Sequence, residues 1–74
     1  MQQIVILGLG YIGLPTAAMF ASHGVRVIGV DTNTDVCNTI NRGEIHIKEP
    51  FLAEIVREQV ANGNISCKTH VEPA

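Results

Sequence analysis

The stretch from residue 4 to residue 13 reads Ile4-Val5-Ile6-Leu7-Gly8-Leu9-Gly10-Tyr11-Ile12-Gly13. It is an apolar run followed by a GxGxxG turn. A second apolar segment ends at Asp31, 18 residues after Gly13. This order predicts a strand, a tight turn, a helix and a second strand that ends in an acid. The arrangement is typical of proteins that bind the pyrophosphate and the ribose of a dinucleotide.

Each glycine of the motif has its own expected role. Gly8 allows the tight turn, Gly10 lets backbone N–H groups approach the phosphates, and Gly13 lets the helix lie close to the strand. The start of the helix offers unpaired N–H donors and a partial positive charge. Asp31 is expected to accept the ribose hydroxyls and to repel a 2′-phosphate, which favours NAD over NADP. The alternative is that the glycines only form a turn in some other α/β protein.

The length and composition are those of one soluble globular unit. The chain has 74 residues, is 46% hydrophobic and 16% charged, and carries a formal net charge of -2. The length is too short for a two-domain enzyme. The weak acidity gives no reason to expect a nucleic-acid or membrane partner, and no stretch reaches the roughly 18 apolar residues of a membrane span. We therefore expect a cytoplasmic protein.

The cysteines and histidines do not indicate a catalytic or metal centre. Cys37 and Cys67 form neither a CxxC pair nor a metal-ligand spacing, so we interpret both as small buried hydrophobic residues. No two histidines share a metal-ligand spacing on one element, and no metal site is predicted. His46 could approach a substrate or cofactor in a complete enzyme, although packing of its ring against neighbours is the favoured interpretation.

The remaining pattern predicts an α/β chain with the element order β-α-β-α-α-β. Right-handed crossovers between parallel strands give the strand order 3-2-1 and place every helix on one face of the sheet. Pro50 is expected at the first position of the third helix, because its missing N–H loses nothing there. The expected strands cover 3–8, 25–31 and 65–68, and the expected helices cover 11–23, 33–42 and 50–62.

One face of this predicted sheet has no helix to cover it. The first strand is also an open edge, yet it is apolar on successive residues, as expected for a strand that is buried on both faces. We therefore expect residues 1–74 to be the first half of a Rossmann-type doubly wound domain whose second half is absent. Alone, the chain should be marginally stable or should form homo-oligomers through the uncovered face or edge.

Two stretches of the chain resemble the UDP-glucose/GDP-mannose dehydrogenase family. Residues 8–15, GLGYIGLP, resemble the opening of that family. Within them Leu14-Pro15 leans toward the branch that acts on N-acetylated UDP-sugars or on GDP-mannose. Residues 40–50, INRGEIHIKEP, also resemble this family, and this resemblance is more specific than the glycine motif alone. Together the two stretches extend the similarity over almost the whole chain.

The resemblance implies an NAD-dependent oxidation in which C6 of a UDP-N-acetylhexosamine, expected to be UDP-N-acetylmannosamine, becomes a carboxylate. The catalytic residues of the family lie downstream of this chain, so no catalytic residue is assigned and the chain alone should be inactive. Tyr11, Ile12 and Asp31 match cofactor-contacting positions of the family, alongside the three glycines. Two alternatives stay open: a stand-alone NAD-sensing regulatory module, and the N-terminus of another hydroxy-acid dehydrogenase.

Overall fold

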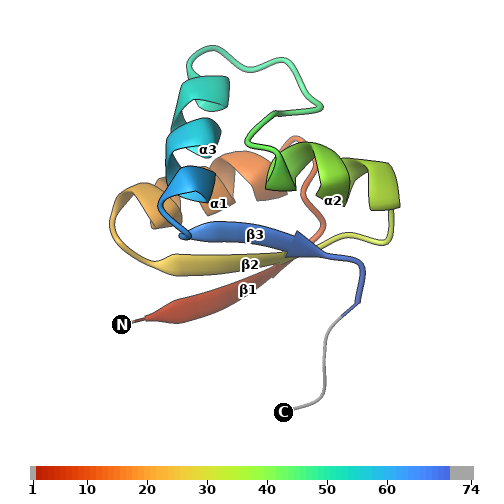
Figure 1. The fold of residues 1–74 in the computed structure, drawn as a ribbon, viewed down its shortest axis with the longest axis horizontal. Coiled ribbons are helices and arrows are strands. Elements are labelled where there is room, and N and C mark those ends of the chain that lie inside the picture. The colour runs from red at the N-terminus through yellow and green to blue at the C-terminus, as the bar shows by residue number, and fades with distance from the viewer. Residues whose placement is uncertain (1, 71–74) are drawn as a thin grey trace.

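The computed structural model describes residues 2–70 and contains three parallel strands with three helices above them (Figure 1). The strand order is β1-β2-β3, and all helices lie on one face of the sheet. The predicted α/β class and strand order are therefore confirmed. No helix in the described part is long and apolar enough to cross a membrane. The elements are β1 Gln3–Leu7, α1 Gly13–Ser22, β2 Arg26–Val30, α2 Thr34–Asn41, α3 Leu52–Ala61 and β3 Ile65–Lys68.

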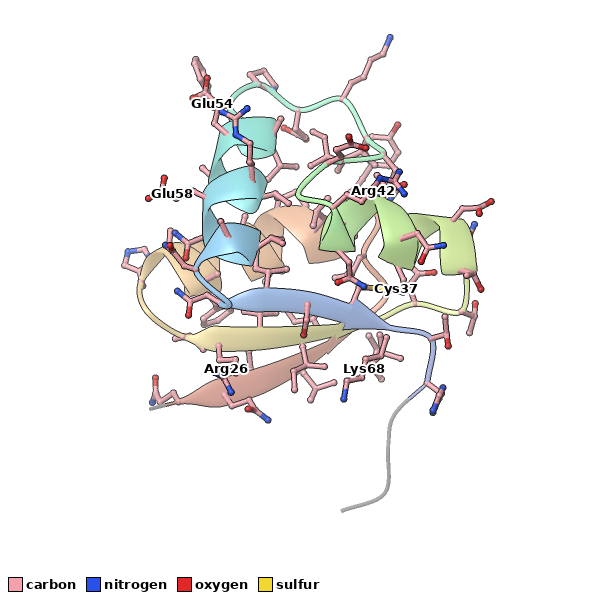
Figure 2. The ribbon with its side chains drawn as sticks, in the orientation of Figure 1. Arg26, Cys37, Arg42, Glu54, Glu58 and Lys68 are labelled. Carbon is pink, nitrogen blue, oxygen red and sulfur yellow. A yellow bond between two sulfur atoms is a disulfide. The ribbon has the colours of Figure 1, made fainter. Side chains whose placement is uncertain are left out.

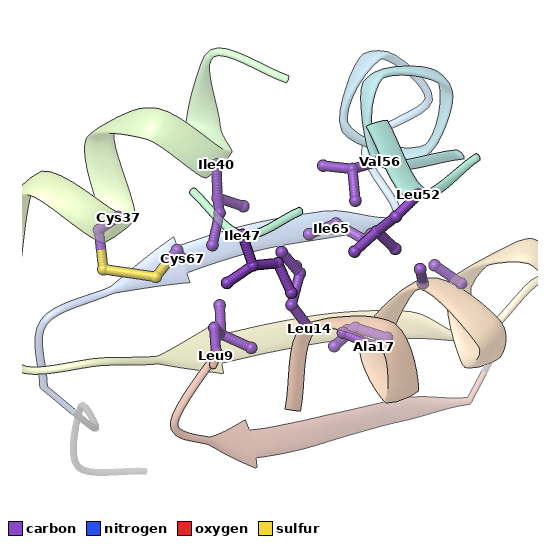
Figure 3. Packing of buried hydrophobic residues seen from close by; sticks show 13 residues of the cluster. Leu9, Leu14, Ala17, Cys37, Ile40, Ile47, Leu52, Val56, Ile65 and Cys67 are labelled. Carbon is purple, nitrogen blue, oxygen red and sulfur yellow. A yellow bond between two sulfur atoms is a disulfide. The ribbon is translucent and has the colours of Figure 1, made fainter. Parts of the chain in front are cut away.

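The core lies between the sheet and the helices (Figure 3). Side chains along a strand point alternately to its two faces, so every second residue of each strand contributes to this layer. The helices close it with small and aliphatic residues, and the connection before α3 adds Ile47. Its largest fully buried side chains are Leu9, Leu14, Val27, Ile40 and Val56.

The helix boundaries differ from the expected ones at two places. Tyr11 and Ile12 form a turn, and α1 begins at Gly13. The prediction that Pro50 starts the third helix is wrong, because α3 begins at Leu52. The residue before it, Phe51, has a φ of 67°. A residue in this left-handed region cannot belong to a right-handed helix, so Pro50 lies in the preceding turn.

The start of α2 is capped by a side chain. The side-chain oxygen of Asn33 accepts hydrogen bonds from the N–H groups of Asp35 and Val36, at 2.9 and 3.3 Å. These two bonds satisfy donors that the first helical turn leaves unpaired. Asn33 is therefore the N-cap of α2.

The two cysteines are buried, as expected, but they are also bonded to each other. Cys37 of α2 and Cys67 of β3 form a disulfide; the two residues are 30 positions apart in sequence, and their Cα atoms are 4.9 Å apart (Figure 3). This pairing could not be predicted from the local sequence pattern, because the bond joins an element that precedes α3 to one that follows it. The interpretation as separate small hydrophobic residues is corrected accordingly.

The face of the sheet opposite the helices is bare within the described residues. Val5 and Leu7 of β1 are 49% and 74% exposed, so the burial expected for both faces of β1 is not met within this part of the chain. In β2 and β3 the same face carries half-buried residues, apart from the exposed Arg26 at the start of β2. Arg26 and Lys68 lie on this side of the sheet in Figure 2. We call this surface the bare face; its residues are Val5, Leu7, Arg26, Ile28, Val30, Ser66 and Lys68.

Candidate cofactor site

Two adjoining hollows lie where β1 and β2 end. The smaller one is lined by Leu7, Gly8, Val30, Asp31 and Thr32. Leu7 and Gly8 also line the larger one, so the glycine-rich loop and Asp31 open onto one continuous part of the surface. This edge of a parallel sheet is where ligands of such folds bind. The larger hollow is lined by Ile6, Leu7, Gly8, Gly10, Tyr11, Ile12, Gly13 and Thr16.

The loop before α1 presents a set of unpaired backbone donors. Ile12 is the N-cap of α1 and makes no side-chain capping bond. The first bond into the helix runs from the N–H of Leu14 to the carbonyl of Gly10, at 3.0 Å. Unpaired N–H groups at a helix start suit an anionic ligand such as a diphosphate. Within residues 2–70, no hydrogen bond is made by the N–H groups of Gly10, Tyr11, Ile12 and Gly13.

The three motif glycines have the geometry expected of them. Gly8 has a φ of +84°, which residues with a side chain rarely adopt. A Cβ at Gly13 would lie 1.8 Å from the carbonyl oxygen of Gly8, so only glycine lets α1 approach β1 this closely. A Cβ at Gly10 would meet nothing within 4 Å. The space beside Gly10 is therefore open to a ligand rather than filled by the protein.

Asp31 points at the glycine-rich loop. Its Oδ2 accepts a hydrogen bond from the N–H of Leu9 at 3.1 Å, and its Oδ1 accepts one from the N–H of Asn33 at 3.0 Å. The Asn33 bond, followed by the Leu9 bond, lowers the pKa of the Asp31 carboxyl, while partial burial opposes the shift and the charge of His46 adds a smaller lowering. Asp31 is therefore held as a carboxylate, and each oxygen keeps capacity for a further donor such as a ribose hydroxyl.

Leu9 is the part of this site that sequence reasoning missed. It occupies the variable position between Gly8 and Gly10, yet its side chain is completely buried. A Cβ at Gly29 would lie 2.2 Å from the Leu9 Cδ1 atom, so the glycine in the middle of β2 makes room for this leucine. The buried side chain fixes the backbone N–H that holds Asp31. A glycine inside an apolar strand was the available signal, because it often marks a close approach.

The other candidate residues lie outside this pair of hollows. His46 is exposed in the connection before α3 and lines neither hollow, although its charge contributes to the lowered pKa of Asp31. Arg42 pairs with Glu44 at 3.3 Å at the far end of α2. Glu54 and Glu58 lie exposed along α3, which fits a solvated helix face rather than a site (Figure 2). No group of three potential metal ligands occurs in the described part of the chain.

The chain is similar over nearly its whole length to one known protein family. Residues 2–74 match the NAD-binding domain of the UDP-glucose/GDP-mannose dehydrogenase family. UDP-N-acetyl-D-mannosamine dehydrogenase of Escherichia coli K12 is 58% identical over 66 residues, which are 89% of this chain and 16% of the relative. NDP-N-acetyl-D-galactosaminuronic acid dehydrogenase of Ralstonia nicotianae is 52% identical over 73 residues, or 99% of this chain and 17% of the relative.

The fold agrees with the sequence relationship. The native structure of UDP-N-acetyl-mannosamine dehydrogenase from Staphylococcus aureus superposes with a TM-score of 0.91 at 44% identity. The superposition covers 96% of this chain and 17% of the larger protein. The chain therefore spans less than a fifth of the length of the relatives it matches.

Proposed function

The chain belongs to the UDP-glucose/GDP-mannose dehydrogenase family, and from this we propose that it holds the adenosine half of NAD in an NAD-dependent nucleotide-sugar 6-dehydrogenase. NAD is the cofactor of the matched domain. When bound, it supplies the acceptor for hydride in the oxidation of an alcohol. The observation that carries the proposal is the shared opening of the glycine-rich loop and Asp31 onto adjoining hollows.

Each part of the cofactor has a matching group in this chain. The four unpaired N–H groups of residues 10–13 would receive the diphosphate, and the bare backbone at Gly10 would let it come close. The Asp31 carboxylate would accept the two hydroxyls of the adenosine ribose and would repel a 2′-phosphate. Gly8, Tyr11 and Ile12 would line the same opening. This complementarity supports NAD rather than NADP.

The proposed substrate is a UDP-N-acetylhexosamine, most specifically UDP-N-acetylmannosamine, oxidised at C6 to the uronate. The names of the similar proteins from Escherichia coli and Staphylococcus aureus support this choice. We assign no catalytic residue to this chain. Cys37 and Cys67 are buried and bonded to each other, so neither offers a free nucleophile here.

We further propose that residues 1–74 are the first half of the dinucleotide-binding domain, in a cytoplasmic enzyme. The bare face supports this, since exposed Val5 and Leu7 require a cover that residues 2–70 do not provide. The second half of the domain is the proposed cover. The alternative is that this chain associates with itself through the same face. Sedimentation distinguishes the two: a cover from the second half predicts that chain 1–74 self-associates through this face and the intact protein does not.

Calorimetry of the intact protein with NAD and NADP tests the cofactor proposal. Asp31→Ala should weaken NAD binding about 5- to 150-fold, because it removes charged hydrogen bonds worth about 1–3 kcal/mol. Asp35→Ala is the matched control, because Asp35 is an exposed acid of α2 with no side-chain hydrogen bond in the described residues. Equal affinity for NAD and NADP, or equal effects of the two substitutions, would contradict the role of Asp31.

Gly10→Ala separates binding from folding. Its Cβ meets no protein atom, so the unfolding free energy should change by less than about 0.5 kcal/mol, while NAD binding weakens because the methyl group enters the space proposed for the phosphates. Unchanged NAD affinity would place the phosphates elsewhere. A protein that binds NAD but oxidises no nucleotide sugar would instead favour the regulatory module.

A further inference from the structure

The disulfide joins the two backbone segments that support Asp31. The N–H of Asp31 donates to the carbonyl of Lys68 at 3.0 Å, and Lys68 directly follows Cys67. On the other side, the Asn33 N–H holds Asp31 Oδ1 at 3.0 Å, and the Asn33 carbonyl accepts the N–H of Cys37 at 3.2 Å. The Cys37–Cys67 bond therefore closes a ring of contacts around the base of Asp31.

The position of the pair allows both the bonded and the reduced state. The Cα separation of 4.9 Å lies inside the usual range for disulfides, so the bond needs no large backbone movement. Both cysteines are nearly inaccessible, at 4% and 6% exposure. A small disulfide reaches them only when α2, the eight-residue helix that carries Cys37, opens locally.

We propose that Cys37 and Cys67 are a reversible thiol–disulfide site that uses a low-molecular-weight disulfide, such as oxidised glutathione, as oxidant, and that its closure strengthens NAD binding by fixing Asp31. The second part rests on the proposed function of Asp31. A reversible pair also suits the proposed cytoplasmic location, where disulfides are usually transient and redox-sensing.

The exchange balances without any further reagent. The thiolate of one cysteine attacks a sulfur of the small disulfide, forms a mixed disulfide and releases one small thiolate. The second cysteine, as its thiolate, attacks the protein sulfur of that mixed disulfide and releases the other small thiolate. Two electrons pass from the protein to the oxidant, and the two protein protons end on the two released thiols. An excess of small thiol reverses both steps.

The test uses the intact protein equilibrated with reduced or oxidised glutathione. Mass mapping after alkylation should find the Cys37 and Cys67 peptides linked in the oxidised sample and separate in the reduced one. NAD affinity, measured by calorimetry on both samples, should fall about three- to tenfold on reduction, the range of one positioning hydrogen bond. The double variant Cys37→Ala/Cys67→Ala is the matched control, and its NAD affinity should not respond to glutathione.

The outcomes separate the two proposals. Absence of the linked peptides, equal NAD affinity in both states, or a response that persists in the double variant would each overturn the redox coupling. If the double variant does not fold, the test uses the wild-type protein over a series of ratios of reduced to oxidised glutathione. NAD affinity should then rise with the fraction of linked Cys37 and Cys67 peptides, and an affinity that does not follow this fraction would overturn the coupling. If neither the oxidised nor the reduced protein binds NAD, the proposed function is overturned, and so is the proposed effect of the disulfide on NAD binding. The peptide map then still shows whether Cys37 and Cys67 form a reversible disulfide.

Discussion

The two edges of the sheet differ in whether their outward backbone groups have hydrogen-bond partners. At the β3 edge, the side chain of Asn41 accepts the N–H of Cys67 at 2.8 Å and donates to its carbonyl at 3.0 Å. At the β1 edge, the outward N–H and C=O groups of Val5 and Leu7 have no neighbouring strand among the described residues. One edge is closed from within the chain, and the other has no partner strand among the described residues.

This difference bears on the proposal that residues 1–74 are the first half of a larger domain. Proteins normally block an exposed strand edge, because unpaired backbone groups recruit other chains. The β3 edge has a side-chain amide that imitates a neighbouring strand and a covalent bond next to it. The β1 edge has neither, and it adjoins the bare face with its exposed apolar residues. The asymmetry agrees with a domain that continues beyond β1.

The largest expected effect comes from removing the covalent closure at β3. In the oxidised protein, Cys37→Ala/Cys67→Ala should lower the unfolding free energy by about 3–4 kcal/mol, because the bond closes a long loop in the unfolded chain. Denaturant titration measures the change. Reduced wild-type protein is the control that keeps both sulfur atoms in the core. Equal stability of oxidised and reduced wild-type protein would show that the bond does not secure this edge.

The hydrogen-bonded closure should have the next largest effect. Asn41→Ala leaves the N–H and C=O of buried Cys67 without partners, which should cost about 1–3 kcal/mol. Asn38→Ala lies on the same helix, is exposed and makes no side-chain hydrogen bond in the described residues, so its effect should stay within about 0.5 kcal/mol. Denaturant titration of both variants should separate them, and equal changes would mean that Asn41 does not close the edge.

The open side of the sheet could be predicted from the sequence, whereas the closed side could not. Successive apolar residues in β1, together with the direction of the crossovers, were sufficient to predict a face without helices. The Asn41 and Cys37 contacts with Cys67 join residues that are 26 and 30 positions apart. Such contacts depend on how α2 packs against β3, which a local pattern does not contain.

Some residues of the candidate site could also be predicted from the sequence, and others could not. The glycine spacing and Asp31 were visible in the sequence, because turn geometry and phosphate binding restrict those positions to particular residues. Leu9 was not predicted, since its burial depends on the space that Gly29 leaves on the neighbouring strand. The start of α3 was misplaced, because the left-handed conformation of Phe51 overrides the preference of Pro50 for a helix start.

Leu7→Lys tests whether the β1 side is uncovered. Leu7 is 74% exposed, so in chain 1–74 the substitution should change stability by less than about 0.5 kcal/mol and should reduce self-association in sedimentation. Phe51→Lys is the control, because Phe51 is 79% exposed but lies outside the bare face. A large loss of stability in chain 1–74 would mean that Leu7 is covered from within. A larger loss in the intact protein than in chain 1–74 would support the second half as the cover.

The last expected effect is pH-dependent and concerns Asp31, whose carboxylate accepts the N–H of Leu9 and whose own N–H donates to the carbonyl of Lys68. Its pKa is lowered in the folded state, so the carboxylate adds stability above its unfolded pKa of about 3.9. That contribution is lost as the pH falls through the lower folded pKa. The advantage of wild type over Asp31→Asn in denaturant titrations should therefore be constant above about pH 5 and shrink in acid. Asp35→Asn supplies the control profile, and an advantage that grows toward low pH would show that the backbone donors of Asn33 and Leu9 do not hold the carboxylate.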